Sequence, residues 1–152
     1  MENDSNCVER IVRAFSDCWN RHNIDGMVQL FAEDAEFVNA EFIEGIGLWW
    51  KGCDEIRGAH VSMHAPIFKY SRIMITKIVV RFIKPDVAIA RSLWELSGQL
   101  GPSGEPLYEK KGILMNVVSL TSSGWKIIDT QMLRTPISFE VFSRRRRRPS
   151  GI

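Results

Sequence analysis

The stretch SRIMITKIVVRFIKPDVAIARSLWELS, residues 71–97, decides the fold class of this 152-residue chain. Its two halves are rich in Ile, Val, Leu and Trp, which favour β-strands, and Lys84-Pro85-Asp86 separates them with a turn signal. The same composition returns over residues 108–120 and 124–134. Connections this short favour antiparallel strands, because a parallel crossover needs roughly a dozen residues or more. The second half of the chain is therefore predicted to be an antiparallel meander.

The first half of the chain has the helical period instead. Over residues 6–22, apolar residues recur at spacings of three and four, and Asn6 followed by Glu9 is expected to cap the start of this helix. Two more helices are expected, over residues 25–31 and over residues 53–65. Helices first and strands afterwards predict an α+β fold rather than an alternating α/β fold.

One folded domain is expected over residues 1–134, with a short strand at residues 35–39, and a flexible tail over residues 135–152. The tail contains the run Arg144 to Arg148. These five arginines contribute a charge of +5. Because the formal net charge of the whole chain is +2, the rest of the chain has a net charge of −3. A slightly acidic body is not a nucleic-acid surface, and nucleic acid is therefore expected as a partner only through the tail.

The composition, with 45% hydrophobic and 25% charged residues, is that of an ordinary globular domain. No apolar run approaches the roughly 20 residues that cross a bilayer, and the acidic start does not read as a secretory signal, so a cytoplasmic location is expected. The chain has three cysteines, which we interpret as free thiols. It has no Gly-rich dinucleotide fingerprint and no cluster of metal ligands, so no cofactor and no metal are expected.

The predicted strands are apolar on both of their faces. In the strand that follows the turn, Val87, Ile89 and Leu93 point to one face, and Ala88, Ala90, Trp94 and Leu96 point to the other. A sheet with one solvated face would alternate apolar and polar residues, so this sheet is expected to be covered on both sides. The helices supply one cover. A second subunit is the economical source of the other, which predicts a homodimer.

The order of elements resembles the SnoaL-like, or nuclear transport factor two-like, superfamily. Several phrases resemble its SgcJ/EcaC-type group, namely Trp19-Asn20-Arg21-His22, Leu30 to Asn39, Trp50-Lys51-Gly52, Pro85-Asp86-Val87-Ala88 and Gly124-Trp125-Lys126-Ile127. The resemblance covers residues 8–134. It implies three N-terminal helices packed on a strongly curved, mainly antiparallel sheet, a cone-shaped α+β barrel that encloses a ligand pocket. It does not select an activity, because members include isomerases, cyclases, hydratases and non-catalytic association modules.

Two positions of this resemblance carry neutral amides. Asn39 stands where ketosteroid isomerase-like members have an acidic general base, and an amide has no comparably basic lone pair. Gln131 stands where the SgcJ-like pattern tends to carry a histidine. Both are expected to contact a ligand, although Asn39 can equally cap the end of its strand.

Histidine and aspartate are the residues that could move a proton. His60 and His64 share one face of the third predicted helix, with His60 expected in the pocket or in the core and His64 at the rim or surface. Asp129 is the only carboxylate near Gln131 on the last strand, where it acts in the pocket or pairs with Arg91 or Lys126. A histidine with a pKa near 6.5 can serve as a general acid or base.

Three functions follow from these residues. The first is a small-molecule pocket protein for a lipophilic or aromatic ligand held by Asn39, Trp50, His64, Trp94 and Gln131; the SgcJ/EcaC resemblance links it to natural-product metabolism and to the label oxidoreductase. The second is a cofactorless isomerase, cyclase or hydratase that uses His60 with Asp129 as its catalytic residues. The third is a dimeric association module with a vestigial pocket.

Overall fold

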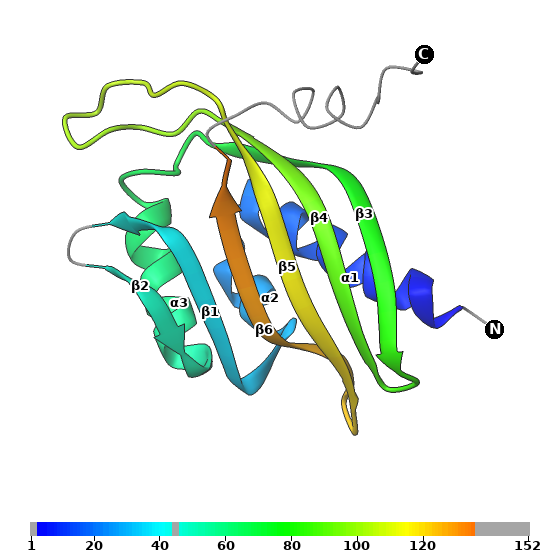
Figure 1. Ribbon diagram of the computed structural model, residues 1–152. Coiled ribbons are helices and arrows are strands. Elements are labelled where there is room, and N and C mark those ends of the chain that lie inside the picture. The colour runs from blue at the N-terminus through cyan, green and yellow to red at the C-terminus, as the bar shows by residue number, and fades with distance from the viewer. Residues whose placement is uncertain (1–2, 44–45, 136–152) are drawn as a thin grey trace, which may run out of the picture.

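The computed structural model describes residues 3–43 and 46–135, which form three helices and six strands (Figure 1). Two of the strands precede the third helix and four follow it. The helices are α1 (Asp4–Asn20), α2 (Ile24–Val28) and α3 (Gly52–His64). The strands are β1 (Phe31–Ile43), β2 (Gly47–Lys51), β3 (Arg72–Lys84), β4 (Val87–Ser97), β5 (Lys110–Thr121) and β6 (Gly124–Arg134). Of the tail predicted over residues 135–152, residues 136–152, including Arg144 to Arg148, lie outside the described residues.

The strands form one sheet in the order β2-β1-β6-β5-β4-β3. All neighbouring strands are antiparallel except β1 and β6, which run parallel. The predicted mainly antiparallel α+β fold is confirmed. The sheet does not close into a barrel, because β2 and β3 remain at its two edges.

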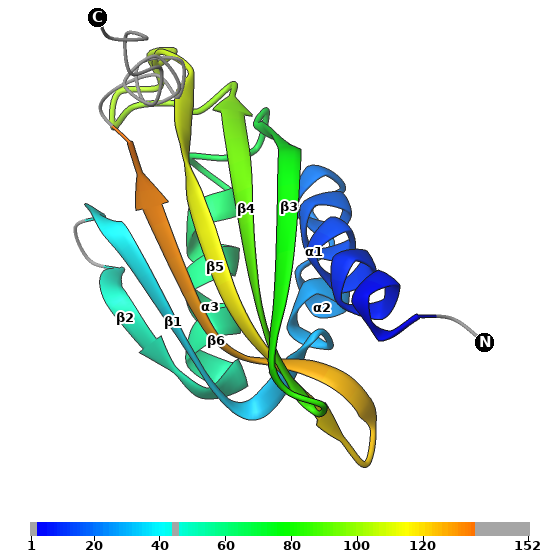
Figure 2. The ribbon, with the colours of Figure 1, turned by 45° about the vertical axis from the view of Figure 1, so that its right-hand side comes forward.

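All three helices lie on one side of the curved sheet (Figure 2). α1 packs on β3 and β4, and α3 packs on β1 and β2. The core between the layers is apolar, and its fully buried members include Val12 and Phe15 of α1, Ile56 of α3, and Leu114 and Val118 of β5. The opposite face of the sheet is not covered by any element that the structure describes.

The structure corrects several element boundaries. The cap of α1 is Asn3 rather than Asn6, and its side-chain oxygen accepts a hydrogen bond of 3.1 Å from the amide of Ser5. α2 ends at Val28, before the predicted residue 31. The predicted five-residue strand at residues 35–39 is the middle of the 13-residue β1. The rest of β1 was not predicted, because charged residues interrupt its apolar pattern outside residues 35–39. Such residues are tolerated in a strand whose one face is exposed.

A bulge in β6 changes which of its residues face the helices. Ile127 pairs with Val118 and Asp129 pairs with Val117, so Ile128 has no direct partner on β5. The extra residue shifts the alternation by one position, and Thr130 and Met132 continue the buried face of Ile127. Asp129 and Gln131 therefore lie on the uncovered face.

Asn20 fastens α1 to the edge strand β3. Its side-chain amide donates to the carbonyl of Ile73 at 2.9 Å and accepts from the amide of Ile73 at 2.7 Å. These two bonds replace those that a neighbouring strand would make. We expect Asn20→Ala to lower the free energy of unfolding by about 1–3 kcal/mol in urea denaturation, because it leaves both backbone groups unpaired.

Asn6→Ala is the matched control for this prediction, because Asn6 is exposed on the same helix and its side chain does not cap it. Its effect is expected within about 0.5 kcal/mol. Equal effects of the two substitutions would show that the Asn20 contact does not stabilise the fold.

Candidate functional site

A small cavity lies between the helices and the concave face of the sheet. Its walls come from five segments, namely Trp19, Asn39, Phe68, Trp94, Leu96, Met132 and Arg134. Its volume is about 20 Å³, which is room for about one water molecule. The predicted interior pocket is therefore nearly filled by side chains in this conformation.

Trp94 and Asn39, two of the predicted ligand-binding residues, lie in this wall. Trp94 is 3% exposed, and its ring lies against the backbone of Gly112 on the neighbouring strand. Among the described residues its indole nitrogen Nε1 has no hydrogen-bond partner. Asn39 extends the face of β1 that also carries the buried Phe37. A ligand that enters this cavity would thus meet an aromatic ring, an unpaired N–H donor and an amide.

His60 and Trp50 pack into a cluster of rings next to the cavity. The ring of His60 lies 5.1 Å from that of Phe37, 5.5 Å from Trp50 and 6.0 Å from Trp19, all in edge-on arrangements. Trp50 is tied in place by a 2.9 Å hydrogen bond from its indole nitrogen to the carbonyl of Ile46. His60, Trp50 and Phe37 thus contact one another and form one wall of the interior.

His60 is held in a single tautomer. It is 1% exposed, and its Nδ1 lies 2.7 Å from the carbonyl oxygen of Ile56, so Nδ1 carries the proton and donates it. Burial lowers the pKa of His60 to about 4, against a smaller raising effect of the Ile56 hydrogen bond. The ring is therefore neutral at pH 7, and its Nε2 lone pair is buried without a partner among the described residues. This atom can accept a hydrogen bond or a proton.

His64 is buried, whereas the sequence placed it at the rim or surface. It is 5% exposed, because the ring of Trp19 covers it at a centroid distance of 4.4 Å. Its Nδ1 lies 3.0 Å from Nδ1 of His22 at the end of α1. Burial, followed by the neighbouring His60 and His22, lowers the pKa of His64 to about 3. His64 thus joins α3 to α1 as a neutral ring.

Asp129 and Gln131 lie on the other side of the sheet from His60. The hydrogen bond of 2.8 Å from the hydroxyl of Thr130 to Asn116 points inward, so the adjacent Asp129 and Gln131 point outward. Burial, and then the charge of Glu36, raise the pKa of Asp129. The amine of Lys126 donates to the carbonyl of Gln29, away from Asp129. The sheet therefore separates Asp129 from His60.

Three buried polar side chains of the concave face were missed in the sequence. Ser92, Asn116 and Thr130 are each at most 1% exposed. Ser92 Oγ and Asn116 Nδ2 have no hydrogen-bond partner among the described residues. For Ser92 and Asn116 the signal was available, since each stands at an inward position of β4 or β5 between apolar residues. Thr130 faces inward only because of the bulge in β6, which the sequence pattern does not show.

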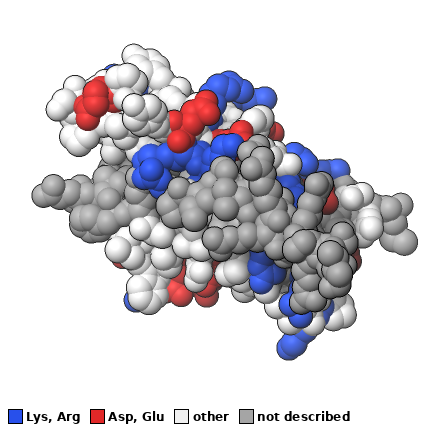
Figure 3. Space-filling model, turned by 45° about the horizontal axis from the view of Figure 1, so that its top comes forward, with Lys and Arg blue, Asp and Glu red and all other residues white. Residues whose placement is uncertain are grey.

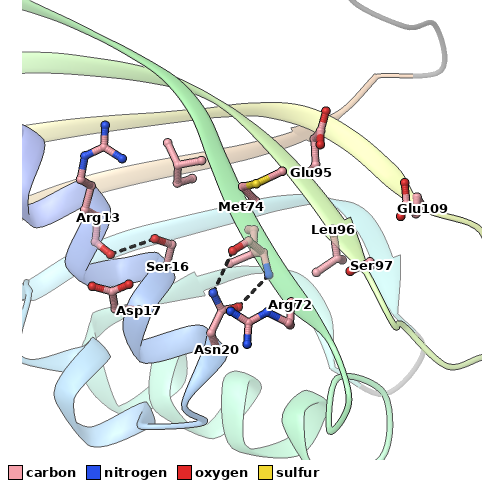
Figure 4. Close-up of a pocket in the computed structure, with 12 residues that line it drawn as sticks. Arg13, Ser16, Asp17, Asn20, Arg72, Met74, Glu95, Leu96, Ser97 and Glu109 are labelled. Atoms are coloured by element: carbon pink, nitrogen blue, oxygen red, sulfur yellow. Dashed lines mark hydrogen bonds between the residues drawn. The ribbon is translucent and has the colours of Figure 1, made fainter.

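Several larger hollows open outside the cone. One of about 340 Å³ is lined by the predicted ligand residue Trp50 of β2 and by Ala59 of α3, among others. Two others are larger. One is a cleft of about 440 Å³ between α1 and the edge of the sheet (Figure 4). Arg13 and Asp17 of α1 and Arg72 of β3 lie around it, so both signs of charge are present. The other is a groove of about 550 Å³ between the start of α2 and α3, lined by Val61 and His64 among others. Neither of these two hollows contains a predicted ligand residue except His64.

On the side shown in Figure 3, groups of Lys and Arg atoms lie next to Asp and Glu atoms. Within residues 3–43 and 46–135, no three His, Cys, Asp or Glu side chains are grouped closely enough to hold a metal ion. In the same part of the chain, no helix combines the length and apolar character that a membrane crossing needs. Cys7, Cys18 and Cys53 all lie in the described part of the chain, and none of them is in a disulfide there.

Comparison with known proteins identifies the fold and a family. A family model described as SnoaL-like domain matches residues 12–119. An uncharacterised Caulobacter vibrioides protein with a cystatin-like fold superposes with a TM-score of 0.81 at 20% identity, covering 95% of this chain and 98% of that chain. No curated protein sequence matches.

Two further solved structures share the fold. A nuclear transport factor 2-like superfamily protein from Salmonella enterica serovar Typhimurium has a TM-score of 0.74 at 11% identity, with 88% of this chain and 92% of that chain covered. A hexachlorocyclohexane dehydrochlorinase has a TM-score of 0.74 at 14% identity, with 89% of each chain covered.

Proposed function

Because the chain belongs to the SnoaL-like domain family, we propose that it is a small-molecule pocket protein whose ligand occupies the interior between the helices and the concave sheet face. The ligand is a lipophilic compound with an aromatic or other ring and a neutral polar group. Trp50, His60 and Trp94 contact its ring and Asn39 contacts its polar group. His64 supports this wall through Trp19.

One observation carries this proposal, which is that the ring-lined interior holds buried polar atoms without partners among the described residues, one of which, Trp94 Nε1, belongs to the cavity wall. Trp94 Nε1, His60 Nε2, Ser92 Oγ and Asn116 Nδ2 all lack a hydrogen-bond partner among the described residues. A buried polar group left unpaired costs about 1–3 kcal/mol, so folded proteins keep few of them. A ligand with a carbonyl or hydroxyl group would satisfy several at once.

The ligand must be neutral near its polar group. His60 is uncharged at pH 7, because burial lowers its pKa to about 4. Asn39, Ser92 and Asn116 offer dipoles only, and a buried charge without a counter-charge is costly. A hydroxyl or ketone therefore fits better than a carboxylate.

Binding requires the interior to open. A cavity of about 20 Å³ is far smaller than the roughly 300 Å³ of a typical ligand site, so side chains must move outward before a ring can enter. Met132 and Phe68 stand in the cavity wall and are not tied by side-chain hydrogen bonds. Their displacement makes a conformational step part of binding.

Acid–base catalysis by His60 together with Asp129 is not supported by this geometry. The two groups lie on opposite sides of the sheet, and a general acid or base must come within hydrogen-bond reach of its proton. His60 alone can still orient a hydroxyl through Nε2. Binding without turnover is therefore the function that these residues support best, with no cofactor required.

The proposal is tested with 2-naphthol as a probe, with binding followed through tryptophan fluorescence. Met132→Phe adds volume to the cavity wall and is expected to weaken binding at least tenfold. Val61→Phe places the same ring in the groove between α2 and α3, where Val61 is 52% exposed, and is expected to change binding less than twofold.

The reverse pattern, with binding lost in Val61→Phe and kept in Met132→Phe, would move the ligand site out of the cone. Absence of binding to the unmodified protein would contradict the pocket proposal for ligands of this class.

A second candidate function is supported by a different observation. The sheet face opposite the helices is not covered by any described element and carries Ile89, Leu93, Ile113 and Met115 among charged residues, which fits a homodimeric association module. Ligand binding and dimer formation are separable, because Met132→Phe alters the cone alone. A dimer that persists in this variant, together with no ligand affinity in the unmodified protein, would favour the association module.

A further inference from the structure

His22 stands at a position where the backbone favours glycine. α1 ends in a Schellman motif, in which the amide of His22 donates to the carbonyl of Trp19 at 3.0 Å and the amide of Asn23 donates to that of Cys18 at 2.9 Å. This ending holds His22 at a φ of 55°, and no other non-glycine residue of the described chain has a positive φ. Glycine would take this conformation without steric cost, so the histidine side chain needs a reason of its own.

The ring of His22 meets the ring of His64 across the join between α1 and α3. Their Nδ1 atoms lie 3.0 Å apart, and the ring planes cross at 76°. His22 is exposed and His64 is 5% exposed, and both rings line the groove of about 550 Å³ between the start of α2 and α3. Two nitrogens from distant parts of the chain thus meet in the wall of an open groove.

The distance between these two nitrogens is close to the spacing that one metal ion imposes. Imidazole nitrogens bind zinc at about 2.0–2.1 Å, so two of them on one tetrahedral ion lie about 3.3 Å apart. The 3.0 Å separation is held here by a shared proton, which one Nδ1 donates and the other accepts. An ion can replace that proton if each ring turns slightly and keeps its remaining proton on Nε2.

The groove supplies solvent access and a mixed set of charges. No third His, Cys, Asp or Glu is grouped with the pair in the part of the chain that the structure describes, so water must complete the coordination. Arg57 forms an ion pair with Asp25, and the amine of Lys69 lies 5.1 Å from the centre of the Tyr70 ring. Because these two cations exceed the single carboxylate of the groove, a bound cation is held mainly by the histidines.

We propose that His22 and His64 form a two-histidine site for zinc or a similar divalent transition metal ion, bound through both Nδ1 atoms and completed by water. Imidazole ligands favour such ions over calcium and magnesium, which prefer oxygen. The two histidines are 42 positions apart in sequence, so the site exists only in the folded chain. The ion therefore fastens the end of α1 to α3 and stabilises the folded state.

The test is a titration of the full chain with zinc, followed by nitrogen NMR of the histidine rings. The chain has three histidines, so each ring can be assigned. Zinc is expected to shift the Nδ1 signals of His22 and His64. His60 is the internal control, because its Nδ1 donates to the carbonyl of Ile56 at 2.7 Å and its signals should stay in place.

Two variants remove one ligand each, and calorimetry measures their affinity for zinc. His22→Gly suits the positive φ, so this variant is expected to keep the wild-type circular dichroism spectrum while binding zinc at least tenfold more weakly. His64→Gln is expected to show the same loss. Cys18→Ser is the control for binding by a thiol near the end of α1, and its affinity is expected to change less than twofold.

The melting temperature gives a second measurement of the same site. Zinc is expected to raise it in the wild type and in Cys18→Ser, and to leave it unchanged in His22→Gly. Zinc affinity that is equal in the wild type, His22→Gly and His64→Gln would place the ion on other side chains and overturn the proposal. Unmoved His22 and His64 signals at millimolar zinc would overturn it as well.

Discussion

Gly112→Ala is expected to destabilise the fold strongly, by about 3 kcal/mol. A Cβ at Gly112 would overlap the carbonyl oxygen of Leu133 and the indole ring of Trp94. The first of these is backbone in a paired strand and cannot move without breaking the sheet. Gly112 therefore provides the space in which Trp94 lies, and Trp94 is a wall of the proposed site.

Gly58→Ala is the matched control, because nothing lies within 4 Å of a Cβ built at Gly58 in α3. Alanine in a helix interior is favoured over glycine by roughly 0.5–1 kcal/mol, so this variant is expected to be more stable than the wild type. Urea denaturation of both variants measures the difference. A Gly112→Ala protein as stable as wild type would mean that Trp94 does not pack on this strand as described.

Acidification from pH 7 to pH 4.5 is expected to destabilise the protein by about 2.5 kcal/mol through His60 alone. The pKa of His60 is lowered by burial from 6.5 to about 4, so the unfolded chain binds a proton that the folded chain refuses. This stability is present above pH 6.5 and is lost as the pH falls toward 4. His64, with its pKa lowered to about 3 by burial and by neighbouring histidines, acts in the same direction.

Urea denaturation at several pH values measures this effect. Asp129 has the opposite effect on stability. Burial raises the pKa of Asp129 in the folded state, so the folded chain binds this proton more readily than the unfolded chain and gains stability as the pH falls. His60→Gln keeps a side-chain donor for the carbonyl of Ile56 but does not titrate, so its stability should vary less between pH 7 and 4.5. Identical pH profiles for His60→Gln and the wild type would contradict the buried neutral His60.

The fold was predictable from the sequence because its signals are local. Apolar residues spaced three and four apart predicted the three helices, and runs rich in Ile, Val, Leu and Trp predicted four of the six strands. The resemblance to the SnoaL-like superfamily is confirmed by the family match. β1 was predicted only in part, because Glu33 and Asp34 interrupt the apolar pattern of its first residues. The family's SgcJ/EcaC-type group and the tail as a separate region stay predictions.

The arrangement of the candidate site was less predictable, because it depends on contacts between distant segments. A single bulge at Ile128 turns Asp129 and Gln131 away from the interior, and alternation along a strand cannot reveal an unpaired residue. The burial of His64 depends on Trp19 and His22, more than 40 positions away in sequence. The filling of the cavity likewise depends on how Phe68, Trp94 and Met132 meet.

The most direct test of the interior ligand site is an NMR measurement of where 2-naphthol contacts the protein. Met132 lines the interior cavity, whereas Met74 lines the cleft between α1 and the sheet edge, so methionine methyl groups distinguish the two hollows. The interior site predicts nuclear Overhauser contacts between 2-naphthol protons and the Met132 methyl, together with a shift of the Trp94 indole N–H signal. Contacts confined to Met74, with the Met132 and Trp94 signals unmoved, would contradict it.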